Sequence, residues 1–301
     1  MLKFPLKSRA NKMKKAKLEE LALTIPSFLW LIIFFFIPTL VIFTFAFKPS
    51  DPFGGIGEGW TLENIYTLLD ASYLLLIWRT VWLSVLTTVF CLACALPVGY
   101  QLARASTRTR QLILLLIIVP FWSSFLVRIF AWKALLHPEG FFKNFLVQLH
   151  LADPSVSLLY NSGTVLLVMV YTYLPFAVLP IYASASKFNF QLLEAAADLG
   201  STRLYAFVKV FLPSIRKGLG TATLMVFIPA IGAYVIPDLV GGTQSEMIGN
   251  KIAQRTFIDR NLPLASGLSA LLSIIILLPM SIFTLIQSKA KRLSFEGRVK
   301  E

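Results

Sequence analysis

Long apolar runs that contain almost no charged residues constrain this chain more than any other feature of its sequence. The hydrocarbon core of a bilayer is ~30 Å thick, and a helix needs about 20 apolar residues to cross it. Of the 301 residues, 56% are hydrophobic and only 14% are charged. We therefore predict an all-α integral membrane protein with six transmembrane helices, at residues 21–47, 74–103, 112–136, 163–186, 219–240 and 264–287.

Lys and Arg are distributed unevenly along the chain, and this predicts which side of the membrane each loop faces. If the N-terminal tail is cytoplasmic, 20 of the 28 Lys and Arg residues lie on the cytoplasmic side and only 5 lie in the three outer loops. Cytoplasmic loops of membrane proteins are enriched in Lys and Arg, so we predict that both termini are cytoplasmic. The net charge of +13 then reflects topology, and no nucleic acid partner is expected.

The chain lacks the short motifs that mark common catalytic and nucleotide-binding sites. It contains no G-x-x-x-x-G-K-[ST], no H-E-x-x-H and no G-x-S-x-G. Cys91 and Cys94 have no histidine or further cysteine nearby, so packing within the second span is a better interpretation than a metal or redox site. We predict that this chain has no catalytic residue and binds neither a metal nor a cofactor.

Without a nucleotide site of its own, the chain must take any energy it needs from an ion gradient or from another subunit. A gradient-driven secondary transporter would have carboxylates or histidines at mid-span and paired inverted repeats. The predicted spans are almost free of charge, and no such repeat is evident. A membrane-embedded enzyme, the other alternative, would need a nucleophile or a metal set.

A polar stretch between the fourth and fifth spans, EAAADLGSTRLYAFVKVFLP at residues 194–213, differs from everything around it. Asn189 can cap a helix that runs through about Leu199, because the alanines favour helix strongly. Gly200 supplies the left-handed conformation that ends many helices. Ser201 is the expected cap of a second helix, and Pro213 is expected to close it.

The first of these two helices carries a polar stripe made by Gln191, Glu194 and Asp198. An amphipathic connector lying on the membrane is one interpretation. The inner leaflet repels negative charge, however, and an acidic stripe beside a flat alanine face is better suited to a groove in another protein.

This stretch resembles the cytoplasmic EAA loop of binding-protein-dependent ABC importer permeases, whose pattern is E-A-A-x-x-x-G, nine residues, then I-x-L-P. Here the first part is Glu194-Ala195-Ala196 with Gly200, and the second is Val210-Phe211-Leu212-Pro213, with Val in place of Ile. In that family the loop is the coupling helix that fits a cleft in a separate ATPase subunit. The resemblance therefore implies a set of ATPase-coupling residues, namely Glu194, Ala195, Ala196, Asp198, Gly200, Leu212 and Pro213.

The resemblance also implies the fold and the partners. The expected fold is that of a type I importer permease in a bacterial inner membrane. The expected partners are two ATPase subunits that hold ATP and Mg, a second and different six-helix permease, an extracytoplasmic binding protein and membrane lipid. The chain would then divide into a basic tail at 1–20, a first helix and outer loop at 21–73, a five-helix core at 74–287 with its coupling loop at 187–218, and a cytoplasmic tail at 288–301.

Two further stretches, Pro120–Ile129 and Pro237–Gly242 followed by Met247–Asn250, resemble the spermidine/putrescine permeases of that family. Polyamines are the substrates that this implies, with another small solute as the alternative. A polycation needs carboxylates and aromatic faces. The candidate residues of a substrate path or gate are Asp238, Arg128, Trp122, Tyr171 and Tyr173.

These candidates have competing interpretations. The aromatic residues could instead anchor the protein at the membrane interface or pack against other helices. Asp238 is the one acidic residue in or next to a span outside the tails, and charge at membrane depth usually faces a cavity or a partner. We hypothesise that Arg128 pairs with Asp238 near the outer end of the bundle. The alternative is that Arg128 extends to the lipid headgroups.

Overall fold

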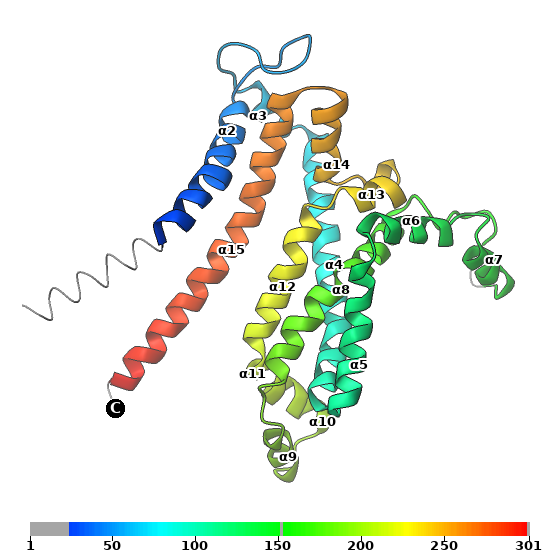
Figure 1. Cartoon of the computed structure of the whole chain (residues 1–301), viewed down its shortest axis with the longest axis vertical. Helices are drawn as coiled ribbons and strands as arrows, with labels where there is room; N and C mark the ends of the chain where they lie inside the picture. The colour runs from blue at the N-terminus through cyan, green and yellow to red at the C-terminus, as the bar shows by residue number, and fades with distance from the viewer. Residues whose placement is uncertain (1–23, 151–152, 300–301) are drawn as a thin grey trace, which may run out of the picture.

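Helices dominate the computed structural model, which describes residues 24–150 and 153–299 (Figure 1). Three of them are long and apolar enough to cross a membrane. They are the helical span Thr24–Phe45, which includes η1 (Ile32–Phe36) and α2 (Ile37–Phe45), then α4 (Ala71–Arg104) and α8 (Ser162–Ala185). They coincide with the first, second and fourth predicted spans.

The third predicted span is not one straight helix. It consists of α5 (Thr107–Ile118), the 3₁₀ turn η2 (Val119–Trp122) and α6 (Phe125–Leu135). The two halves meet at a bend of 93°. Pro120 disfavours helix in the residue before it, and Ser123 and Ser124 then adopt extended backbone with ψ of 152° and 138°. Ser123 Oγ donates to the carbonyl of Pro120 at 2.7 Å, which stabilises the break.

The fifth predicted span is also interrupted, into α12 (Arg216–Ile231) and α13 (Val235–Val240). In a continuous helix the ring of Pro237 would clash with the carbonyl of Ala233, so the chain leaves helical geometry before α13 begins. The sixth predicted span is longer than expected. As α15 (Leu262–Val299) it continues through most of the stretch that we expected to be a cytoplasmic tail.

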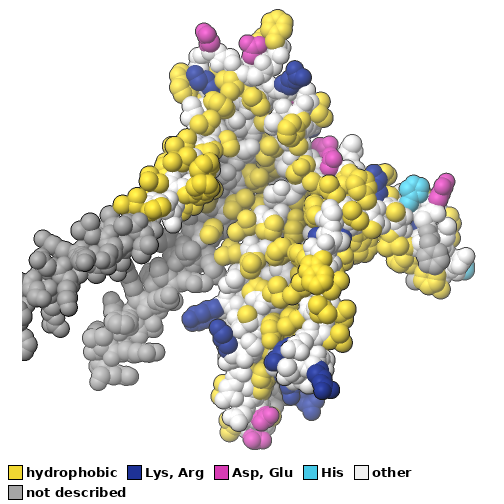
Figure 2. All heavy atoms as spheres, in the orientation of Figure 1, with side chains coloured by type: hydrophobic (Ala, Val, Ile, Leu, Met, Phe, Trp, Pro, Cys, Tyr) yellow, Lys and Arg dark blue, Asp and Glu magenta, His cyan; other side chains and the backbone are white. Residues whose placement is uncertain are grey.

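The remaining helices are short and lie in the connections. They are α3 (Glu63–Leu68), α7 (Phe141–Gln148), α9 (Gln191–Asp198), α10 (Arg203–Ala206), η3 (Phe207–Phe211), α11 (Leu212–Ser214), η4 (Thr243–Ser245), α14 (Ile248–Ala253) and η5 (Gln254–Ile258). Figure 2 shows hydrophobic side chains over the middle of the molecule and most charged side chains toward its two ends, as a protein surrounded by lipid requires.

Close contacts fix the relative directions of the central helices. Thr87 Oγ1 lies 3.9 Å from Met169 Sδ, and the thiol of Cys91 lies 3.6 Å from the carbonyl oxygen of Val170. Further along, Gly99 of α4 faces Ile181 of α8. Residue numbers rise together along the two helices, so α4 and α8 are parallel. The chain must therefore return across the bundle between them, and α5 with α6 makes that return.

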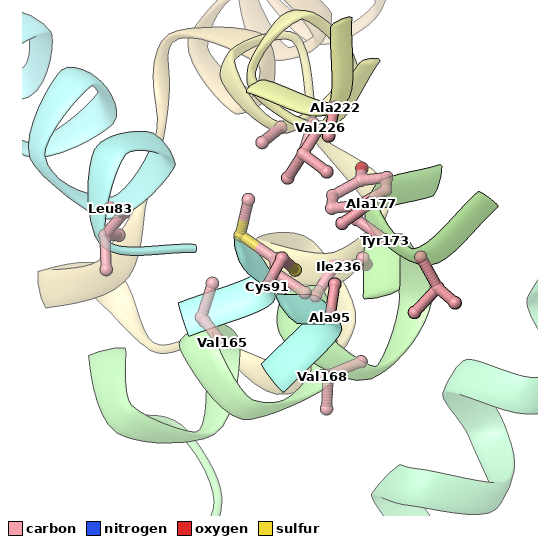
Figure 3. Close-up of a cluster of buried hydrophobic side chains, with 14 of the residues drawn as sticks. Leu83, Cys91, Ala95, Val165, Val168, Tyr173, Ala177, Ala222, Val226 and Ile236 are labelled. Atoms are coloured by element: carbon pink, nitrogen blue, oxygen red, sulfur yellow. The ribbon is translucent and has the colours of Figure 1, made fainter. Parts of the chain in front are cut away.

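Small side chains let the backbones of α4, α8 and α12 approach closely in the buried core (Figure 3). The core residues shared by these helices include Cys91, Ala95, Ala177, Ala222 and Val226. Packing was predicted for both cysteines: it is confirmed for Cys91, which is completely buried, and wrong for Cys94, which is exposed because it faces away from the core. A Cβ atom at Gly218 would lie 2.9 Å from the carbonyl oxygen of Pro180 and 2.5 Å from Ser184 Cβ. Gly218 therefore has no room for a methyl group.

Substitution of Gly218 by Ala should therefore destabilise the bundle. Overpacking of a tight core costs about 1–3 kcal/mol, and the backbone of α8 cannot move away without disturbing α4. Gly232→Ala is the matched control, because its nearest neighbour is the Ile228 oxygen at 3.8 Å and its φ is −88°. The measurement is the fraction of detergent-purified protein that stays monodisperse after heating. Equal losses for the two variants would contradict the packing argument.

Candidate functional site

The polar stretch between α8 and α12 folds as a helical hairpin, defined here as residues 189–214. Its first helix, α9, begins at Gln191, and Phe190 occupies the N-cap position predicted for Asn189. Asn189 lies one residue earlier, where its Oδ1 accepts from the backbone N–H of Gln191 at 3.1 Å. Gly200 adopts a φ of +84°, as predicted for a helix-ending glycine. The N–H of Gly200 donates to Ala197 at 2.9 Å and that of Ser201 to Ala196 at 3.0 Å, which is the Schellman motif.

The second helix is capped by Thr202 and not by Ser201, so that prediction is wrong. Thr202 Oγ1 accepts from the N–H of Tyr205 at 3.2 Å. The Schellman motif uses the N–H of Ser201, and the chain therefore leaves the turn one residue later than we expected. Ser and Thr are both favoured N-cap residues, and here the geometry of the turn selects Thr202 although Ser is the stronger cap.

Pro213 does not close the second helix, which corrects the other prediction about the hairpin. Helical geometry runs from α10 through η3 into α11 and ends only at Ile215, before α12 begins. In the π-helical turn η3, the N–H of Leu212 donates to the carbonyl of Phe207, five residues earlier. This widened turn accommodates Pro213, which lacks an N–H and crowds a regular α-helix.

The tip of the hairpin is exposed, and its charges are unpaired. Glu194, Ala195 and Asp198 are exposed, and Leu199 is 90% exposed. The two ion pairs of the described residues involve neither Glu194 nor Asp198. A shallow groove at the tip is lined by residues from both helices, namely Ala196, Leu199, Gly200, Ser201, Thr202, Tyr205 and Val210. Leu212 and Pro213 lie at the other end of the second helix, away from this groove.

Arg128 and Tyr171 line one cavity of about 200 Å³ beside the bend of the third span. Pro120, Phe121 and Pro175 also line it. The guanidinium carbon of Arg128 lies 5.1 Å from the Phe121 ring centroid, and its Nε is buried without a hydrogen-bond partner. The structure thus brings together two of the five path candidates.

The other three candidates lie apart from this cavity. Trp122 is 78% exposed, and Tyr173 is 7% exposed in the core, where its hydroxyl donates to the Pro229 carbonyl at 3.2 Å. Asp238 is exposed on α13. It forms no ion pair with Arg128, so the predicted pair is wrong. Arg128 is held instead against the aromatic wall of its cavity.

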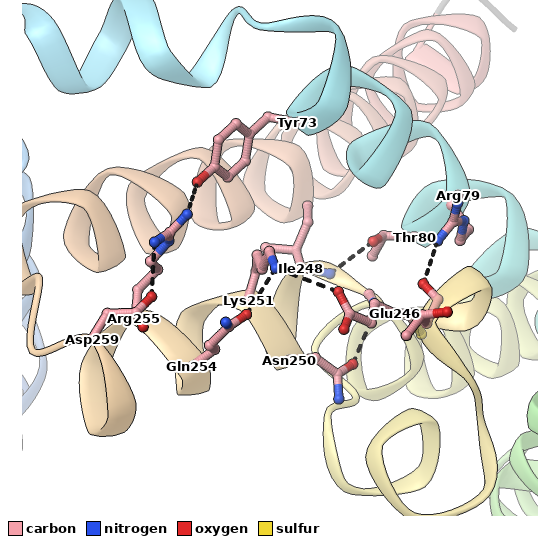
Figure 4. Close-up of polar contacts among 12 residues, drawn as sticks. Tyr73, Arg79, Thr80, Glu246, Ile248, Asn250, Lys251, Gln254, Arg255 and Asp259 are labelled. Atoms are coloured by element: carbon pink, nitrogen blue, oxygen red, sulfur yellow. Dashed lines mark hydrogen bonds and ion pairs between the residues drawn. The ribbon is translucent and has the colours of Figure 1, made fainter. Parts of the chain in front are cut away.

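A polar cluster near the start of α4 was not predicted from the sequence (Figure 4). Arg255 donates to the Tyr73 hydroxyl and to the Asp259 carboxylate, each at 2.8 Å. Burial lowers the pKa of Arg255, but these hydrogen bonds and the nearby charge outweigh it and raise the pKa overall. Thr80 accepts from the N–H of Ile248 at 2.9 Å, so the cluster ties α4 to α14 and η5.

The residues that the structure describes contain no group of three or more His, Cys, Asp or Glu side chains placed to hold a metal ion. The chemistry available to the described site is therefore that of a docking surface and an apolar cavity with one guanidinium. A polar surface at one end of a membrane bundle can receive a soluble partner. The cavity lies further along the bundle, beside α8.

Substitution of Gly200 by Val should loosen the hairpin, because a β-branched residue is strained at positive φ by about 1–3 kcal/mol. Asn tolerates this region, so Gly200→Asn is the matched control. Trypsin cleavage after the exposed Arg203 measures the opening. We expect cleavage at least about fivefold faster in the Val variant, which corresponds to ~1 kcal/mol. Similar rates in both variants would show that the turn does not hold the hairpin.

The comparisons with known proteins agree with this architecture. A family model described as "Binding-protein-dependent transport system inner membrane component" matches residues 95–292, which include the hairpin and every path candidate. The spermidine/putrescine transport system permease protein PotB of Escherichia coli K12 is 33% identical over 264 residues, covering 88% of this chain and 94% of that protein. PotB of Haemophilus influenzae is 31% identical, covering 85% and 90%.

Solved structures show the same fold. A crystal structure of a bacterial ABC transporter involved in the import of the acidic polysaccharide alginate contains a chain that superposes with a TM-score of 0.73. Its sequence is 18% identical, and the match covers 94% of this chain and 99% of that one. The inner membrane ABC transporter permease YdcU of Escherichia coli K12 is a further relative, 29% identical over 278 residues.

Proposed function

Because this chain belongs to the family of binding-protein-dependent transport system inner membrane components, we propose that it is the permease subunit of an ATP-driven polyamine importer. It is a multi-pass protein of the inner membrane. The observation that carries the proposal is the hairpin, whose acidic tip is exposed and has no partner within the described residues. A docking surface of this kind is what a subunit without its own ATP site needs.

The helix directions support six crossings with both termini in the cytoplasm. Because α4 and α8 are parallel, the bent pair of α5 and α6 counts as one return crossing. α12 is antiparallel to α8, since Gly218 lies beside Ser184 while Tyr173 donates to Pro229. Adding the span Thr24–Phe45 and α15 gives six, and the hairpin then shares the cytoplasmic side with the basic loops.

The hairpin would dock in a cleft of the ATPase subunit through Glu194, Ala195, Ala196, Asp198 and Gly200. Leu212 and Pro213 would instead shape the return of the chain into the bundle. Two ATPase subunits would hold ATP and Mg, and a second, different permease would complete the translocation path. ATP binding would close the ATPase pair, move the hairpins and open the bundle outward. A binding protein would then deliver the polyamine from outside.

A cysteine at the tip should capture the ATPase. In a chain whose native Cys91 and Cys94 are replaced by Ala, Ala195→Cys should crosslink to the ATPase subunit through a short bismaleimide in whole cells. Glu139→Cys is the matched control, because Glu139 is also exposed but would lie on the outer side in the proposed topology. The readout is the shifted band that carries both subunits. Its absence from the Ala195→Cys cells would remove the docking role.

Polyamine passage should depend on Asp238. Spermidine is a flexible polycation, and the exposed carboxylate of Asp238 and the exposed ring of Tyr234, one helical turn earlier, are the two kinds of group that such a cation needs. We expect Asp238→Asn to lower ATP-dependent spermidine uptake into proteoliposomes about tenfold or more, whereas Glu58→Gln, an exposed outer-loop control, leaves it unchanged. Full uptake by Asp238→Asn would exclude Asp238 from the path. Uptake of another solute but not spermidine would identify a different importer of the same family.

A further inference from the structure

Five aromatic side chains meet where the hairpin joins the bundle, and we call this cluster the aromatic box. Its members are Tyr100 of α4, Phe188 and Phe190 before α9, and Phe207 and Phe211 of η3. The Tyr100 ring lies edge-to-face with three of them, with centroid distances of 5.7 Å to Phe190, 5.5 Å to Phe207 and 5.0 Å to Phe211. Aromatic rings prefer this geometry, because ring edges are positive and faces are negative.

The phenylalanines also contact one another, so the box holds the two ends of the hairpin together. Phe188 lies 5.3 Å from Phe190 and 5.2 Å from Phe211, both edge-to-face. Phe207 stacks on Phe211 at 5.1 Å. Phe211 is completely buried at the centre of the box, so a displacement of the hairpin reaches Tyr100 through direct contact between the rings.

Arg104 stabilises the box on its cytoplasmic side. Its Nη1 donates to the Tyr100 hydroxyl at 2.9 Å, and its guanidinium carbon lies 5.6 Å from the Tyr100 ring and 5.7 Å from the Phe190 ring. An open cavity of about 590 Å³ borders the box. It is lined by Tyr100, Phe190 and Phe207 of the box, together with Arg104, Glu194 and Arg203. The box thus joins α4 to the hairpin across an otherwise hollow junction.

α4 reaches from this junction to the other end of the molecule. It is continuous over 34 residues, through Pro97, which corresponds to a rod about 50 Å long. At its far end Tyr73, Arg79 and Thr80 hold η4, α14 and η5 through side-chain hydrogen bonds. A displacement of Tyr100 would therefore reach the polar cluster near the outer surface through one continuous helix.

We propose that the aromatic box makes α4 the helix that the hairpin drives, so that the hairpin and the cytoplasmic end of α4 move as one body. Tyr100 is then a positioning residue for coupling, since it acts through the hairpin and touches neither ATP nor substrate. The proposal rests on the proposed function, in which an ATPase docks on the hairpin. It adds that α4 is the helix that receives the motion, and that the motion reaches the polar cluster at the far end of α4.

The first test measures uptake per ATP hydrolysed by the complete transporter in proteoliposomes, with spermidine-loaded binding protein. Tyr100→Leu keeps an apolar side chain but loses the ring, and we expect ATP hydrolysis to continue while spermidine uptake per ATP falls about tenfold. Tyr100→Phe keeps the ring and loses only the Arg104 hydrogen bond, and it should retain the wild-type ratio within about twofold. A wild-type ratio in Tyr100→Leu would overturn the proposal.

The second test does not depend on the assembly of Tyr100→Leu. Cysteines at Arg104 and Arg203, which line the same cavity from α4 and α10, are joined by a flexible bismaleimide in the Cys91→Ala, Cys94→Ala chain. If the two elements move together, crosslinking leaves uptake within about twofold of the same uncrosslinked protein. Loss of uptake on crosslinking would overturn the proposal. If the wild-type chain never binds an ATPase, the proposed function itself is contradicted.

Discussion

Close backbone contact between α4, α8 and α12 is the constraint on which the rest of the structure depends. Lipid tails are as apolar as leucine, so helices inside a bilayer gain little from hiding apolar surface and must be held by packing. Gly99 and Gly218 permit that packing, because each faces α8 where a larger side chain would collide with it. The parallel pair that results dictates the return crossing by α5 and α6, and it fixes the end at which the hairpin emerges.

Most charged side chains that the structure describes lie around this apolar centre, whereas a few hydroxyl groups, such as that of Thr87, are buried within it. At one end, the hairpin exposes carboxylates to the solvent and ties itself to α4 through aromatic rings. At the other end, α4 begins inside a hydrogen-bonded cluster with Arg255 and Ile248. Charged groups are therefore confined to the ends, where water or partners can satisfy them. Among the described residues, Arg128 is an exception, because it lies beside the bend of the third span and packs on Phe121.

Features that depend on local sequence could be predicted, whereas features that depend on contacts between distant parts of the chain could not. Gly200 could be predicted because a positive φ strongly favours glycine, and the helices at residues 71–104 and 162–185 followed from hydropathy. Hydropathy does not report the direction of a helix, so the bend after Pro120 was not predicted. The predicted N-cap of the second hairpin helix was Ser201, and the observed one is its neighbour Thr202. The Arg255 and Tyr73 contact joins residues 182 positions apart, a distance over which local pattern carries no information.

The bend of the third span has a consequence for the surrounding membrane. α5 has 12 residues and the 3₁₀ helix η2 has 4, which together extend about 26 Å along the axis, less than the ~30 Å of an average hydrocarbon core. α6 turns away by 93° and adds little depth. The bilayer must therefore thin beside this segment, or a neighbouring protein must shield its outer end. A solute delivered from outside would meet a shallower barrier there than the thickness of the membrane suggests.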